Sequence, residues 1–119
     1  MKTYIDELGI TYSADRKTLI KGNRGVEHLI IPDTVTKISD NAFWGCESLT
    51  SVVIPDSVAE IGDYAFAYCE SLTSVVIPSS VSKIGICAFH RCEGLTSIVI
   101  PDSVKQIGEG AFGGVISHQ

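Results

Sequence analysis

Four cysteines carry the richest potential chemistry in this 119-residue chain, because a thiolate can bind a metal, attack a substrate or form a disulfide. Cys46, Cys69 and Cys92 follow one another at intervals of 23 residues. Structural zinc sites normally draw on ligand pairs such as C-x2-C, which this chain lacks. We therefore predict that these three are small buried core residues, with a disulfide between neighbouring units as the alternative. Cys87 breaks the series and is predicted to be the more exposed, oxidisable thiol.

Histidines and glutamates are the other side chains that could act in catalysis. The three histidines fall at different phases of the 23-residue interval and have no phase-matched Ser or Cys nucleophile: His28, His90 and His118. Three glutamates recur at that interval and predict a solvated acidic stripe, with a weak Ca²⁺ site as a distant alternative: Glu47, Glu70 and Glu93. We therefore expect no catalytic residue, no cofactor and no metal, and predict that the protein is not an enzyme.

The 23-residue interval extends far beyond the cysteines. The only prolines, Pro32, Pro55, Pro78 and Pro101, keep the same spacing. Further columns of Val, Ile, Ala, Phe and Leu share it, among them Phe43, Phe66, Phe89 and Phe112. A fixed period of this length predicts a solenoid in which each unit buries its apolar face only against its neighbours.

Each unit begins with a short strand that a proline ends. In the segment 72–78, Leu72, Val75 and Ile77 are expected to point inward, while Ser74 and Val76 point outward. The proline has no N–H for a strand ladder and therefore closes the strand. The return segment 81–92 spaces its apolar residues by three, four, one and three, which favours short helical or 3-10 turns over a second regular strand.

The unit L-T-S-V-V-I-P-x-S-V-x-x-I-G-x-x-A-F-x-x-C-x-x resembles the BspA-like leucine-rich repeats of bacterial and protist surface proteins. This resemblance implies a right-handed, curved leucine-rich-repeat solenoid, with a parallel sheet on its concave face and the helical or 3-10 turns on its convex limb. It also implies a cell-surface or secreted setting. No signal peptide is expected in this chain, because its first eight residues include Lys2, Asp6 and Glu7.

The two ends of the array differ. Residues 1–25 are predicted to form an N-terminal capping hairpin, with strands near Thr11 and Leu19. Residues 26–119 are predicted to hold three full 23-residue units flanked by partial ones. The strand 95–100 is expected to leave an unpaired edge, through which the protein could associate with itself.

Two surfaces are candidates for partner binding. The outward strand positions form what we call the aliphatic stripe: Ile30, Val53, Val76 and Val99. β-propensity alone would also explain those residues. On the convex limb, the positions after each phenylalanine carry residue types that anchor interfaces, namely Trp44, Tyr68, His90 and Arg91. Such residues also occur on plain surfaces.

Composition narrows the class of partner. The formal net charge is -5, and nine Lys and Arg residues do not predict the basic face that nucleic acids or anionic lipids require. The longest apolar runs fall far short of the ~20 residues that span a bilayer, so membrane insertion is not expected. We predict a protein-interaction module that serves adhesion or binds a host or partner protein. The alternative is a self-assembling structural repeat or a fragment of a longer surface stalk.

Overall fold

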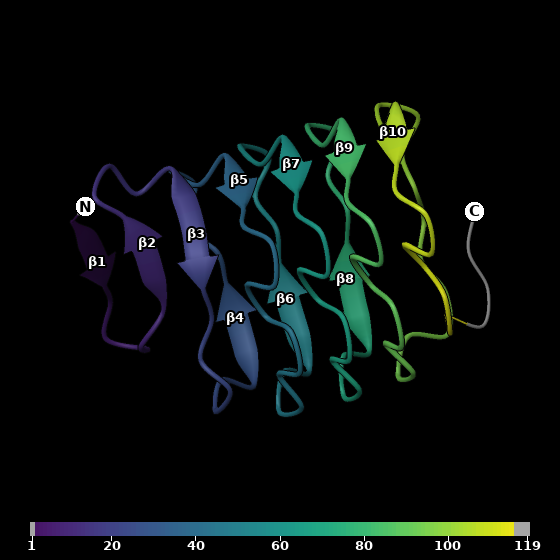
Figure 1. Cartoon of the computed structure of the whole chain (residues 1–119), viewed down its shortest axis with the longest axis horizontal. Helices are drawn as coiled ribbons and strands as arrows, with labels where there is room; N and C mark the ends of the chain where they lie inside the picture. The colour runs from purple at the N-terminus through teal and green to yellow at the C-terminus, as the bar shows by residue number, and fades with distance from the viewer. Residues whose placement is uncertain (1, 116–119) are drawn as a thin grey trace.

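Short β-branched segments that end at proline form the first sheet. β4 (His28–Ile30), β6 (Ser51–Val53) and β8 (Ser74–Val76) pair in parallel, with His28 opposite Ser51 and Ser51 opposite Ser74. The structure, a computed structural model, describes residues 2–115, and these wind into a β-solenoid of about four turns (Figure 1). Each 23-residue turn is called a rung below. The predicted strand and its proline stop are confirmed.

A second, larger sheet forms another side of the solenoid. It contains β5 (Lys37–Ile38), β7 (Glu60–Ile61), β9 (Lys83–Ile84) and β10 (Gln106–Ile107), all parallel. At its N-terminal end it continues through β1 (Thr3–Ile5), β2 (Thr11–Ser13) and β3 (Thr18–Lys21), in the order β1-β2-β3-β5-β7-β9-β10. β2 and β3 form the antiparallel hairpin expected there, and β3 pairs in parallel with β5.

The expected helical or 3-10 limb is wrong for the described residues. Part of that segment is the second set of strands, and the remainder, residues 39–47 and their equivalents, consists of consecutive turns, which we call the turn limb. Its alternate N–H groups donate to the next rung, as from Asn41 to Asp63, from Phe43 to Ala65 and from Gly45 to Ala67, at 2.7–2.9 Å. A helix would need those donors for its own carbonyls, so the ladder between rungs replaces it.

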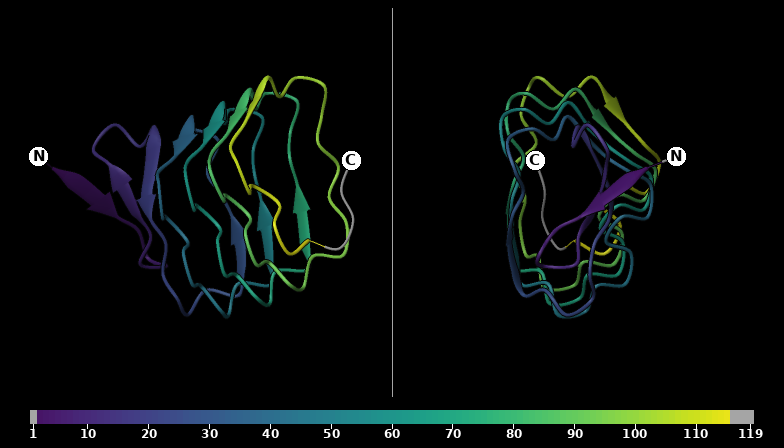
Figure 2. Two further views of the ribbon diagram at one scale, coloured as in Figure 1. Left: turned by 45° about the vertical axis from the view of Figure 1, so that its right-hand side comes forward. Right: turned by 90° about the vertical axis from the view of Figure 1, so that its left-hand side faces the viewer.

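The core is a column of side chains that repeat from rung to rung. Seen along the stack, successive turns follow nearly the same closed path around this core (Figure 2, right). Phe43, Phe66 and Phe89 are at most 1% exposed, and their rings stack in parallel with centroids 5.1 Å apart. The predicted burial of the phenylalanine column is thereby confirmed.

The cysteine column is also buried, and all four cysteines are free, so neighbouring units are not joined by a disulfide. The Cys69 thiol donates to the Phe43 carbonyl at 3.1 Å, and the Cys92 thiol donates to the Phe66 carbonyl at 3.0 Å. Burial raises the pKa of the Cys92 thiol to about 12. A thiol therefore suits this column because it fills little space and satisfies a buried carbonyl.

Gly62, Gly85 and Gly108 recur at the 23-residue interval, although none of the three has the positive φ that commonly requires glycine. A Cβ on Gly85 would instead lie 2.5 Å from the Asp63 backbone nitrogen in the preceding rung. These glycines are therefore required by the close approach of neighbouring rungs.

The fourth rung does not repeat the first sheet fully. In the segment 95–100, only Ile98 takes part in a bridge, whereas each earlier rung pairs three residues in this sheet. The expected complete last strand is therefore wrong, since β8 is the last regular strand of the three-stranded sheet. The missing strand pairing leaves a hollow beside β8, which is described in the next section.

Candidate binding surfaces

The aliphatic stripe lies on the outer face of the three-stranded sheet and its continuation. Its side chains are 76% exposed at Ile30, 55% at Val53, 74% at Val76 and 71% at Val99. The neighbouring strand position faces inward, as Val52 at 3% exposure shows. Four exposed aliphatic side chains on consecutive rungs form a row of apolar surface, of the kind that soluble proteins usually reserve for contacts.

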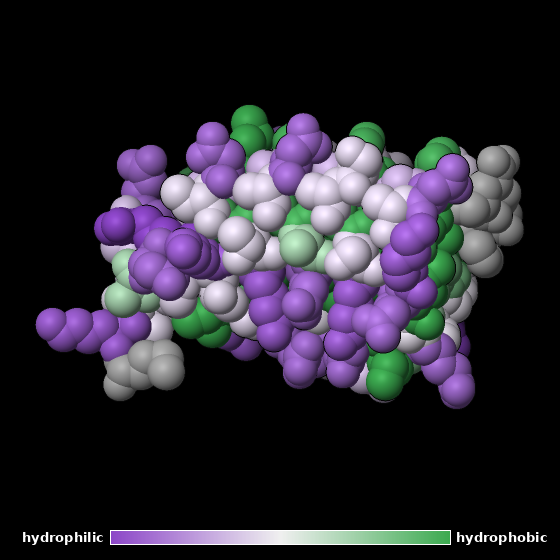
Figure 3. Space-filling view, turned by 90° about the horizontal axis from the view of Figure 1, so that it is seen from above, coloured by the Kyte–Doolittle hydropathy of each residue, from purple (hydrophilic) through white to green (hydrophobic). Residues whose placement is uncertain are grey.

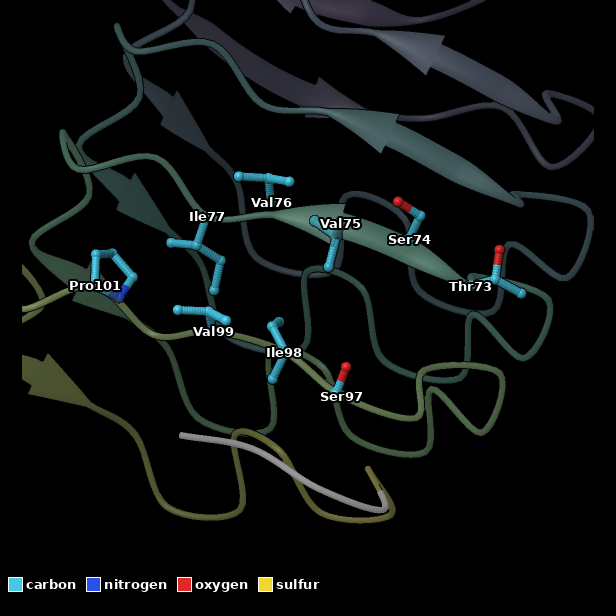
Figure 4. A pocket seen from close by; sticks show the side chains of 9 residues that line it. All are labelled: Thr73, Ser74, Val75, Val76, Ile77, Ser97, Ile98, Val99 and Pro101. Carbon is cyan, nitrogen blue, oxygen red and sulfur yellow. The ribbon is translucent and has the colours of Figure 1, made fainter.

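A shallow hollow interrupts the stripe between β8 and the segment 97–101. Its volume is about 370 Å³, and Val75, Val76, Ile98 and Val99 supply much of its apolar wall (Figure 4). The hollow arises because the fourth rung keeps only the Ile98 bridge to this sheet. The inward residue Val75 is consequently half-buried, although the equivalent Val52 is almost fully buried.

Aromatic side chains follow one another along the turn limb. The Trp44 and Tyr68 ring centroids lie 5.5 Å apart, and those of Tyr68 and His90 lie 5.6 Å apart in a T-shaped contact. We call Trp44, Tyr68, His90 and the adjacent Arg91 the aromatic row. Trp44 is 45% exposed and Tyr68 is 37% exposed, so both offer ring surface to a partner. The structure thus brings together Trp44, Tyr68 and His90 of the turn-limb residues that the sequence indicated, and Arg91 follows His90 in the chain.

Two members of the aromatic row have unusual backbone conformations. Tyr68 has φ 62° and Arg91 has φ 61°, in a column whose other members are Gly45 and Gly114 at φ 70° and 91°. Glycine adopts this left-handed region without penalty, whereas an L-residue there costs roughly 1–2 kcal/mol. Large side chains thus stand where glycine would fold more easily.

Charges around the aromatic row are solvated. Arg91 and Glu93 form an ion pair at 3.4 Å, with both side chains 56% exposed, so it contributes little stability. The glutamates of the acidic stripe, Glu47, Glu70 and Glu93, are all exposed.

Within residues 2–115, no three His, Cys, Asp or Glu side chains gather as metal ligands. His28 and His90 lie on different limbs, and His118 lies outside the described residues.

Tyr64 is a surface residue that the sequence reasoning did not select. It is 38% exposed, and a hydrogen bond to the Cys87 thiol raises the pKa of its hydroxyl. Both residues have a positive φ, 58° at Tyr64 and 52° at Cys87, in a column with Asn41 and Gly110. Asn and Gly in that column were the available signal, since both favour left-handed backbone. Cys87 is half-exposed, as predicted, while the other three cysteines are buried.

A smaller hollow of about 220 Å³ lies at the N-terminal hairpin. Tyr4, Asp6, Tyr12 and Arg16 line it, and the Arg16 guanidinium stacks 4.0 Å from the centroid of the Tyr4 ring. The Tyr12 hydroxyl donates to Asp6 at 3.2 Å, and burial is the main cause that raises its pKa. These groups largely satisfy one another, so their contacts stabilise the hairpin.

The face seen from above is mostly polar (Figure 3). Seen from above, the molecule shows mainly hydrophilic and near-neutral side chains, with hydrophobic ones only in small separate areas (Figure 3). Among the described residues, no helix is long and apolar enough to span a bilayer. The aliphatic stripe and the aromatic row are, in this part of the chain, the two surfaces on which exposed apolar or aromatic side chains follow one another from rung to rung.

Comparisons with known proteins agree with this architecture. A family model described as BspA type Leucine rich repeat region matches residues 19–118 in six copies. No curated protein matches the chain. A crystal structure of a leucine-rich repeat protein from Bacteroides capillosus has a TM-score of 0.77 and 30% identity, covering 98% of this chain and 90% of that one.

Two further crystal structures are similar but longer. A leucine-rich repeat protein from Bacteroides ovatus has a TM-score of 0.75 and 26% identity, covering 99% of this chain and 39% of that one. The T. pallidum leucine-rich repeat protein has a TM-score of 0.65 and 27% identity, covering 94% of this chain and 63% of that one. The chain therefore spans less than two thirds of these two proteins.

Proposed function

Because this chain belongs to the BspA-type leucine-rich repeat family, we propose that it is a non-enzymatic module that binds a partner protein through the aromatic row. The observation that carries the proposal is the presence of Tyr68 and Arg91 at left-handed positions that glycine fills in other rungs. Backbone strain of this kind clusters at binding sites, and here it falls on two residues of types that anchor interfaces.

The physical character of the aromatic row supports protein recognition. Trp, Tyr and Arg dominate the energetic centres of protein interfaces because they bury large, rigid surfaces with few rotatable bonds. Ring contacts at 5.5 and 5.6 Å, with the ladder between rungs beneath them, hold these side chains in place before binding. A net charge of -5 favours a protein partner over nucleic acid.

The biological setting is part of the same proposal. The resemblance to surface-type repeats implies adhesion or binding of a host protein at a cell surface. Self-assembly, alone or within a longer stalk, is the second candidate, and the exposed aliphatic stripe favours it. The two candidates use different faces of the solenoid, so single variants can separate them.

A Tyr68→Gly variant tests the role of the aromatic row. Glycine relieves the left-handed strain, which offsets the loss of ring contacts worth about 0.5–1.5 kcal/mol each, so the fold should melt near the wild-type temperature. The purified protein and the variant would be used to capture proteins from a cell-surface extract. Proteins retained by wild type and by a Ser74→Gly control, but lost by Tyr68→Gly, would support the proposal. Equal retention by all three would show that the aromatic row is not the binding surface.

A further inference from the structure

We infer that the aliphatic stripe is the contact face of a symmetric homodimer, in which Ile30 of each copy fills the hollow beside Val99 of the other. This assignment rests on the second candidate function, self-assembly, and specifies its geometry; it uses a different face from the aromatic row. It rests on the position of one protruding side chain and one hollow at opposite ends of the same stripe.

The protruding side chain and the hollow occur at opposite ends of the stripe. Ile30, on the first rung, is the largest and most exposed member of the stripe at 76%. The hollow of about 370 Å³ lies between the third and fourth rungs, beside Val76 and Val99 (Figure 4). Its volume exceeds that of one isoleucine side chain, so it can receive Ile30 from outside.

Only one symmetric arrangement brings both ends together. A two-fold axis in the contact plane, parallel to the strands and between the rungs of Val53 and Val76, reverses the order of the rungs in the partner copy. With the axis offset toward Val53, Ile30 of each copy lies over the hollow between Val76 and Val99 of the other, and Val53 of one copy packs beside Val76 of the other. The same contact is made twice, as an isologous interface requires, so assembly stops at two copies.

The residues beside the stripe permit close packing. The strand positions on one side carry His28 on the first rung and small hydroxyl groups on the later rungs, and the strands end on the other side at prolines: Ser51, Ser74, Ser97, Pro32, Pro55, Pro78 and Pro101. The serines and prolines carry no charge, so the two faces can approach to the ~10 Å that separates packed sheets, with His28 of one copy opposite the small Ser97 of the other.

The area of the contact face determines how tightly the two copies should associate. Four rungs at ~4.8 Å spacing and three residues along each strand at ~3.3 Å give a contact roughly 20 Å by 10 Å. Two copies would bury on the order of 400 Å² of flat contact area in total, below the ~1,200 Å² at which stable specific interfaces begin. The dimer should therefore be weak and depend on protein concentration up to the millimolar range.

Light scattering and sedimentation of the purified chain between about 10 µM and 1 mM test the dimer. The mass should rise from that of the 12.8-kDa monomer to twice that value and stop there. Val76→Lys and Ile30→Lys should each weaken association at least tenfold and leave the fold intact, because both side chains point outward. Ile86→Lys is the matched control, since Ile86 is also exposed but lies outside the stripe.

Cross-linking tests the arrangement. In a Cys87→Ser background, Ile30→Cys combined with Val99→Cys should give a covalent dimer with a short bis-maleimide, while either substitution alone should not. Efficient cross-linking of Ile30→Cys alone would indicate parallel rungs and overturn the proposed axis. A wild-type monomer at 1 mM, growth beyond the dimer, or unchanged association of Val76→Lys would each overturn the homodimer. None of these results depends on partner capture by the aromatic row.

Discussion

The rings of Phe66 and Phe89 lie parallel to within 7°, with centroids 5.1 Å apart, on two consecutive rungs of the solenoid. Phe43 continues the stack before them and Phe112 after them, with a Phe89–Phe112 separation of 5.7 Å. The column links neighbouring rungs directly, because each ring stacks on the ring of the next repeat.

Truncation of this column should destabilise the protein strongly. Phe66→Ala removes a fully buried ring that contacts both neighbours, so the free energy of unfolding should fall by roughly 3–5 kcal/mol. Urea or thermal unfolding measures the loss. Phe66→Leu, which keeps most of the apolar volume, should lose much less. A midpoint unchanged by Phe66→Ala would contradict the stacking of the rungs.

The close approach at Gly85 gives a second prediction. An alanine Cβ would lie 2.5 Å from the backbone nitrogen and the Oδ1 atom of Asp63, and that backbone cannot move without disturbing the ladder. Gly85→Ala should therefore cost about 1–3 kcal/mol. Gly25→Ala is the control, because the nearest atom to its Cβ would be 3.9 Å away. Equal stability of the two variants would show that rung spacing does not require glycine.

Thiol reactivity should separate the four cysteines. Cys87 is half-exposed, whereas Cys46, Cys69 and Cys92 are buried, and burial raises the pKa of each of those three thiols. One thiol per chain should therefore react quickly with a maleimide at neutral pH, and Cys87→Ser should abolish that fast phase. The other three should react only after denaturation. Fast labelling of several cysteines in the folded protein would contradict the inward column.

Alkaline pH should weaken the fold. The folded pKa of the Cys92 thiol, about 12, lies above the unfolded value of about 8.5, so the folded state retains this proton more tightly. The resulting stability is fully present below about pH 8.5 and is lost as the pH rises toward 12. Burial raises the pKa values of Cys69 and Tyr12 in the same direction.

Urea midpoints measured under reducing conditions at pH 7, 9 and 10.5 should decrease in that order. A Cys92→Ala variant should show a shallower decrease, because one of the titrating groups is gone. A midpoint that does not change between pH 7 and pH 10.5 would mean that these thiols and the tyrosine are not held in their neutral forms by burial.

Some of the binding surface could be predicted from the sequence and some could not. The outward phase of Val53 beside the inward Val52 follows from strand alternation, which is a local property. Exposure of Trp44 and Tyr68 likewise follows from their positions beside a phase-locked phenylalanine. The contacts that join Trp44, Tyr68 and His90 into one row were not predictable, because they connect side chains from three rungs whose relative placement depends on the stack.

By itself, the sequence determined the period, the strand that proline ends, the buried phenylalanine and cysteine columns and the outward stripe. Those features depend on side-chain alternation and on the missing N–H of proline, which act within a few residues. The tertiary structure decided the turn limb, where hydrogen bonds to the next rung, about 22 residues further on, hold Tyr64 and Tyr68 at positive φ. It also decided the hollow beside Val99, since the loosening of one rung depends on how neighbouring rungs pack and not on the residues of that rung alone.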